Sequence, residues 1–138
     1  MNIVIIDGQG GKMGAALTRQ FLEAFPKDSL ISIGTNSMAT AAMLKAGAPR
    51  AATGENPVLV AAKTADLIVG PIGIMSANAL LGEITPKMAA ALSESNAQKL
   101  LLPVNKCAVT VVGAKELSLT DAIREAIVLA KAYLSEEK

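Results

Sequence analysis

The chain has 138 residues, of which 51% are hydrophobic and 18% charged, and its formal net charge is +1. This charge gives no electrostatic support for binding nucleic acid or an anionic membrane. The complete lack of histidine excludes Ser-His triads, histidine general bases and imidazole zinc sites. A single cysteine, Cys107, rules out an intramolecular disulfide and favours a reducing cytoplasm.

The length fits one domain, 1–138. A mean hydropathy of +0.43 is high for so small a domain, so we expect a homo-oligomer in which an apolar face meets a second copy. No stretch approaches the length of a membrane span. The first apolar run, 2–6, is preceded by no basic leader, which favours a buried strand over a signal peptide.

The first two strands are predicted from short runs of apolar residues. The run at 2–6 is β-branched and bounded by Asp-Gly, which is typical of a central parallel strand. Apolar residues at helical spacing then predict a helix from Gly11 until Pro26. A second strand is predicted at 30–34.

The middle of the chain continues this alternation. Asn36 or Ser37 is expected to cap a helix that runs through Leu44, and Gly47 stands where a left-handed residue commonly ends a helix. The stretch 50–56 reads as a loop with room for a short strand.

Two helices are predicted from a capping residue followed by proline. Asn56 and Pro57 would begin a short helix over 57–64, and Thr85 would cap a helix that begins with Pro86. Between them, the apolar run at 66–70 predicts a third strong strand, followed by an irregular stretch punctuated by glycine.

The C-terminal part predicts two strands and a helix. Strands are expected at 99–104 and 108–113, and because the gap between them is too short for a parallel crossover, the second should be an antiparallel edge strand. Ser118 and Asp121 form a plausible capping box for an amphipathic helix, whose apolar face comprises Leu119, Ile123, Ile127, Ala130 and Leu134. The order of elements predicts an α/β, Rossmann-like, three-layer open sheet that is mostly parallel.

The sequence GQGGKMG connects the first strand to the first helix. Glycines at such a turn allow a tight bend and let backbone amides approach a phosphate at the helix N-terminus. Gly8, Gly11 and Gly14 are spaced G-x-x-G-x-x-G, whereas the usual dinucleotide fingerprint is G-x-G-x-x-G. We therefore predict a phosphate or nucleotide site here, with a tight turn that binds no ligand as the alternative.

The segment IDGQGGKMG is similar to the nucleotide-binding turn of dihydrodipicolinate reductases. This resemblance implies that a pyrophosphate would lie against Gly8, Gly11, Lys12, Met13 and Gly14. The chain departs from that family in two respects. Gly34-Thr35-Asn36 follows the second strand where an acidic residue would hold a ribose, and no length remains for a separate catalytic domain.

A second resemblance covers nearly the whole chain. DGQGG, GTN, ATGEN, GPIGI and LGEITPKM, in this order, resemble a family of small bacterial proteins classed as domain of unknown function 3842. The resemblance implies a Rossmann-like fold and no particular activity.

Small and polar residues follow each predicted strand, and the carboxyl ends of parallel strands meet at one edge of a sheet, where ligands bind. The predicted ligand-binding residues are Asp7, Gly8, Gln9, Gly10, Gly11, Lys12, Met13, Gly14, Thr35, Asn36, Glu55, Asn56, Gly70, Pro71, Gly73 and Asn105.

Several of these side chains have a structural alternative. Helix capping is favoured for Asn36, Asn56 and Thr85. Asp7 could bind a ligand hydroxyl, accept hydrogen bonds from loop amides, or hold a Mg²⁺ ion carried by a phosphate. Glu83 fits a solvated loop carboxylate.

Lys106 and Cys107 could form a catalytic pair, because a nearby cation lowers the pKa of a thiol. No histidine base is present, so packing is the favoured role for Cys107.

The leading functional hypothesis is a cytoplasmic homo-oligomer that binds a nucleotide or another phosphorylated small molecule at the glycine turn. One alternative is an NAD(P)-dependent oxidoreductase with an intersubunit site, in which Lys12, Lys106 or Asp7 would supply the proton. The other is a non-catalytic regulatory or scaffold subunit. The sequence names no catalytic residue and no resident metal.

Overall fold

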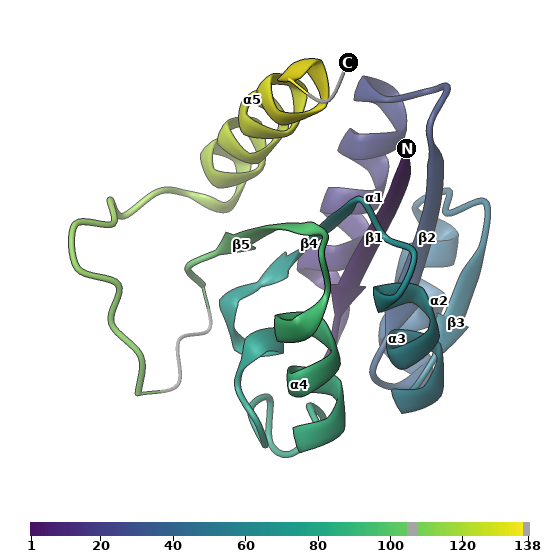
Figure 1. Ribbon diagram of the computed structural model, residues 1–138, viewed down its shortest axis with the longest axis vertical. Helices are drawn as coiled ribbons and strands as arrows, with labels where there is room; N and C mark the ends of the chain where they lie inside the picture. The colour runs from purple at the N-terminus through teal and green to yellow at the C-terminus, as the bar shows by residue number, and fades with distance from the viewer. Residues whose placement is uncertain (105–107, 137–138) are drawn as a thin grey trace.

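A computed structural model describes residues 1–104 and 108–136 (Figure 1). These residues form five parallel strands in the spatial order β3-β2-β1-β4-β5, with helices on both faces. The strands are β1 (Asn2–Asp7), β2 (Ser29–Gly34), β3 (Ala51–Thr53), β4 (Leu67–Pro71) and β5 (Gln98–Leu102). The helices are α1 (Lys12–Ala24), α2 (Ser37–Lys45), α3 (Glu55–Ala62), the 3-10 helix η1 (Ile72–Met75), α4 (Pro86–Glu94) and α5 (Leu119–Glu136).

The sheet separates two apolar layers, because successive side chains of a strand point to opposite faces. Ile3 and Ile5 of β1 lie in the same cluster as α1, α2 and α5, and Phe21 is the largest fully buried side chain there. Val4 and Ile6 lie in the second cluster, with α3, η1 and α4. The predicted three-layer Rossmann-like fold is confirmed.

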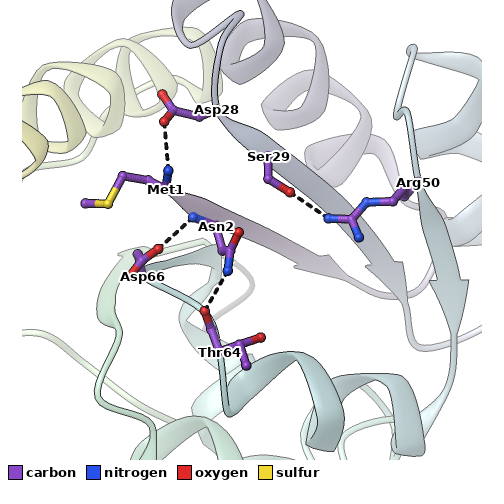
Figure 2. Close-up of polar contacts among 7 residues, drawn as sticks. All are labelled: Met1, Asn2, Asp28, Ser29, Arg50, Thr64 and Asp66. Atoms are coloured by element: carbon purple, nitrogen blue, oxygen red, sulfur yellow. Dashed lines mark hydrogen bonds and ion pairs between the residues drawn. The ribbon is translucent and has the colours of Figure 1, made fainter.

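The amino ends of the strands are held by polar contacts of their own (Figure 2). The N-terminal ammonium group forms an ion pair with Asp28 at 3.1 Å, and the backbone N–H of Asn2 donates to Asp66 at 2.7 Å. Arg50 donates to the hydroxyl of Ser29 at 2.7 Å. These contacts hold the amino ends of the strands together, at the end of the sheet opposite the glycine turn.

The predicted antiparallel strand at 108–113 is wrong. No residue of that segment is in a strand, and all of them are exposed. The sheet of the described residues still has five strands, because the stretch 50–56 contains β3, which pairs in parallel with β2. The β-branched residues of 108–113 favour a strand locally, but strand formation also needs a paired neighbour, which this segment lacks.

The helix predicted at 57–64 begins two residues earlier. Gly54, with φ of 101°, is the N-cap of α3, so Asn56 lies inside the first turn and the predicted cap is wrong. Asn36 does cap α2 by accepting from the N–H of Ala39, and Thr85 caps α4 by accepting from the N–H of Met88, as predicted. Left-handed Gly47 is also confirmed.

The cap of α5 is only partly as predicted. Ser118 accepts from the N–H of Asp121 at 3.1 Å, but the Asp121 carboxylate bonds to Arg124 rather than completing a capping box. The predicted apolar face is confirmed, with Ile123, Ala130 and Leu134 buried against α1 and the sheet. Among the described residues, no helix is long and apolar enough to cross a membrane.

Candidate functional site

The glycine turn joins the buried strand β1 to α1 at the carboxyl edge of the sheet. Gly11 is the N-cap of α1, and its φ of 75° is a left-handed conformation that residues with a side chain rarely adopt. The N–H of Gly11 donates to the Gly8 carbonyl at 2.9 Å. A Cβ atom at Gly11 would lie 2.7 Å from the Cα atom of Ala39. Glycine at position 11 therefore lets α1 begin in close contact with α2.

Asp7 is only 5% exposed and its carboxylate organises this turn. Oδ1 accepts from the N–H of Gly8 at 2.8 Å, and Oδ2 accepts from the N–H of Gly14 at 2.6 Å. Burial raises the pKa of Asp7, since it outweighs the two amide donors, and the nearby charge of Glu83 raises it further. Of the roles considered for Asp7, accepting hydrogen bonds from loop amides is the one observed.

Three backbone amides of the turn are unpaired among the described residues. Within the described part of the chain, the N–H groups of Gly10, Lys12 and Met13 have no hydrogen-bond partner. Lys12 and Met13 are the first two residues of α1, where unpaired amides carry the positive end of the helix dipole. Lys12 also carries an exposed, positively charged side chain.

Glu83 fits a solvated loop carboxylate by its sequence position, but in the structure it is a centre of hydrogen bonding. Its Oε1 accepts from the Gln9 N–H at 2.9 Å, the Thr35 hydroxyl at 2.5 Å and the Asn36 side-chain amide at 2.8 Å. Burial raises the pKa of Glu83, but these three donors together outweigh burial and hold it below its ordinary value. Glu83 thus places a stable carboxylate at the end of β2, where the sequence shows only Gly34-Thr35-Asn36.

The loop between η1 and α4, 76–85, brings Glu83 to this position. Asn78, Leu80 and Leu81 all have φ between 55° and 67°, in the left-handed region that is costly for residues other than glycine. Leu80 is 2% exposed, and its side chain lies 2.9 Å from where a Cβ of Gly8 would stand. Leu80 therefore fills the space beyond the carboxyl ends of β1 and β4.

The other predicted site residues are distributed more widely. Thr35 and Asn36 lie with Gln9 around Glu83. Gly70 and Pro71 end β4 and are buried, as is Gly73 in η1 beneath Leu80. Glu55 and Asn56 begin α3 after the edge strand β3 and have no hydrogen bond to the glycine turn. Asn105, Lys106 and Cys107 lie outside the described residues.

The two carboxylates of this site act as hydrogen-bond acceptors. Both oxygens of Asp7 are bonded to backbone amides, and one oxygen of Glu83 carries three donors, which leaves Oε2 of Glu83 as an available acceptor. Within 1–104 and 108–136, no three acidic or cysteine side chains are grouped so that they could hold a metal ion.

The fold and the turn define a Rossmann-like α/β protein, with the candidate site at the carboxyl ends of β1 and β2. The chain belongs to the family described as domain of unknown function DUF3842, whose model matches residues 2–135. The resemblance that covers nearly the whole chain is thereby confirmed. No curated protein and no solved structure matches the chain.

Proposed function

We propose that the protein binds a ribonucleotide at the glycine turn, with the phosphate on α1 and the ribose on Glu83. The observation that carries the proposal is the ionised Glu83 carboxylate, which is fixed by three donors beside a helix N-terminus whose amides are unpaired. A phosphate needs such amides, and a ribose diol needs an acceptor like Oε2 of Glu83.

The phosphate half of this site consists of the N–H groups of Gly10, Lys12 and Met13 together with the Lys12 ammonium group. Amides at a helix start and a cation on the same side form a compact anion site. Gly10 contributes space, because a Cβ atom at this position would have no neighbour within 4 Å.

The ribose half of the site separates a nucleotide from a simple phosphorylated metabolite. The carboxylate of Glu83 is held in one orientation by Gln9, Thr35 and Asn36, so it can accept from a ligand hydroxyl without reorganising. A phosphorylated compound without a neighbouring hydroxyl would leave Oε2 of Glu83 unused.

Leu80 favours a mononucleotide over an extended dinucleotide. In doubly wound sheets a dinucleotide crosses the point where the strand order reverses, which here lies between β1 and β4. Leu80 occupies that space between Gly8 and Gly73. The oxidoreductase alternative would require the loop at 76–85 to move, whereas a mononucleotide on the β1–β2 side would not.

The test is a thermal-shift and calorimetry panel of ATP, GTP, FMN, coenzyme A, S-adenosylmethionine, NADH and NADPH, with inorganic phosphate as the minimal probe. A ligand at a hundred times its Kd stabilises by about 2.7 kcal/mol, a shift of several degrees for a domain of this size. We expect a ribonucleotide to give this shift and its 2′,3′-dideoxy analogue to bind at least about tenfold more weakly, a difference of about 1.4 kcal/mol.

Two variants examine the two halves of the site. Glu83→Gln should weaken binding of the ribonucleotide and leave binding of the dideoxy analogue nearly unchanged. Lys12→Ala should weaken binding of both compounds. Lys63→Ala, an exposed lysine at the end of α3, is the matched control and should bind as the wild type does. A panel without any shift, or tighter ribonucleotide binding by Glu83→Gln, would overturn the proposal. The second outcome would mean that Glu83 occupies the place of the ligand.

A further inference from the structure

The sheet has an open edge along β5. The N–H of Gln98 donates to the Asp66 carbonyl, so in this parallel pair the backbone groups of alternate residues face β4. Those of Lys99 and Leu101 consequently face away from the sheet, and within the described part of the chain they have no partner. An unpaired strand edge is a template for another strand.

The usual protection of such an edge is missing here. Charged side chains on an edge strand normally discourage pairing. Lys99 is the charged residue of β5, but its ammonium group donates to the carbonyls of Ser93 and Ser95, back toward the end of α4. The rest of the strand is Gln98 followed by three leucines, 100–102.

A strand-forming segment of the same chain lies unpaired nearby. Residues 108–113, AVTVVG, belong to the long excursion between β5 and α5 in Figure 1, and every residue from 108 to 118 is exposed. Val112 is 96% exposed. Among the described residues, no hydrogen bond joins 108–113 to the sheet. In an extended conformation, Val109 and Val111 would lie on the same side of the segment.

An apolar groove of about 280 Å³ runs beside this open edge. Its walls include Leu100 and Leu102 of β5 and Ala126 and Leu129 of α5. The excursion between these elements closes the groove with Gly113, Ala114, Lys115 and Leu117. Leu129, on α5, is 49% exposed. The groove therefore offers apolar contacts next to the unpaired backbone groups of Lys99 and Leu101.

We propose that the protein is a symmetric homodimer in which the 108–113 segment of each protomer forms the edge strand beside β5 of its partner. Val109 and Val111 would enter the partner's groove, and the backbone of the segment would pair with Lys99 and Leu101 of β5. A second copy is the occupant that we infer, since each copy carries both an open β5 edge and a β-branched segment without a strand partner among the described residues. Two copies would pair both β5 edges reciprocally, in a closed two-fold arrangement.

The first test is the mass of the protein in solution, measured by light scattering after size-exclusion chromatography at micromolar concentration. The wild type should have twice the mass of one chain, and Val109→Asp/Val111→Asp should have the mass of one chain while keeping the helical part of its circular dichroism signal. Val60→Asp, which changes a 57% exposed valine on α3, is the control and should remain a dimer. A monomeric wild type, a dimer that survives the double substitution, or an open-ended polymer would overturn the proposal.

The second test distinguishes exchange between copies from pairing within one chain. In a Cys107→Ser background, one tagged copy carries Leu101→Cys and a differently tagged copy carries Val111→Cys. After mixing and mild oxidation, we expect a disulfide-linked product that carries both tags. The doubly substituted single chain should also form linked dimers; if it yields only an internally bridged monomer, the segment pairs with its own β5 and the proposal fails.

Discussion

Glu83 accepts the hydroxyl hydrogen of Thr35 at 2.5 Å, although 48 residues separate the two positions in the chain. This contact joins the η1–α4 loop to the end of β2 and makes the candidate site a product of tertiary structure. Neither residue belongs to the glycine turn, yet together they define what lies beside it.

Asp7 and Glu83 should titrate in opposite directions from their ordinary values. Burial raises the pKa of Asp7, so carbon-detected NMR should place its midpoint above 3.8. For Glu83 burial acts in the same direction, but the three hydrogen-bond donors outweigh it, so its midpoint should lie below 4.5. Midpoints that both lie on the same side of these ordinary values would contradict the balance of burial and hydrogen bonding assigned to one of the two carboxylates.

The contribution of Glu83 to stability should depend on pH. Because its pKa is lower in the folded state than in the unfolded state, the stabilisation is present above the ordinary pKa of 4.5 and is lost as the pH falls through the folded value. The difference in unfolding free energy between the wild type and Glu83→Gln should therefore shrink from pH 7 toward pH 3 in urea titrations. A difference that stays constant over this range would be inconsistent with an ionised, hydrogen-bonded Glu83.

Substitutions at the two adjacent glycines should have very different effects. Gly11→Ala places a Cβ atom 2.7 Å from the Ala39 backbone in a left-handed conformation, and we expect a loss of at least about 2 kcal/mol. Gly10→Ala meets no atom within 4 Å and should change stability by no more than about 1 kcal/mol. Chemical denaturation measures both. Equal losses would show that the turn does not pack against α2 as described.

The buried hydroxyl pair of Thr18 and Ser32 should be coupled. The two oxygens lie 2.8 Å apart between α1 and β2, and both residues are fully buried. Thr18→Val or Ser32→Ala alone leaves one hydroxyl without a partner, at a cost of about 1–3 kcal/mol. The double variant removes both hydroxyls, so its loss should be smaller than the sum of the single losses by about 1 kcal/mol. Additive losses would argue against the bond.

Much of the fold could be predicted because local sequence and tertiary structure agree. The apolar runs of β1, β2 and β4 are buried on both faces of the sheet, and Asn36 and Thr85 cap helices where their spacing indicates. The strand prediction for 108–113 was wrong because β-branched composition favours a strand but does not show whether a neighbouring strand is present to pair with it.

The candidate site was only partly predictable for a related reason. Glycines of the turn lie within seven residues of one another, so their spacing in the sequence reveals them. Glu83 reaches the same place through a loop with three left-handed residues other than glycine, and no short-range pattern indicates that path. The acidic residue expected at the end of β2 is absent there, and the loop at 76–85 instead brings the carboxylate of Glu83 to that place.

The all-parallel sheet also governs how the chain can fold. Asn2 of β1 pairs with Ser29, and Ile3 pairs with Leu67, so the central strand finds one neighbour a whole helix later and the other only at the middle of the chain. During synthesis β1 leaves the ribosome first and stays without its second neighbour until β4 emerges. Since every strand pairing closes a long loop, the rate of folding should be limited by assembly around β1 rather than by formation of any single helix.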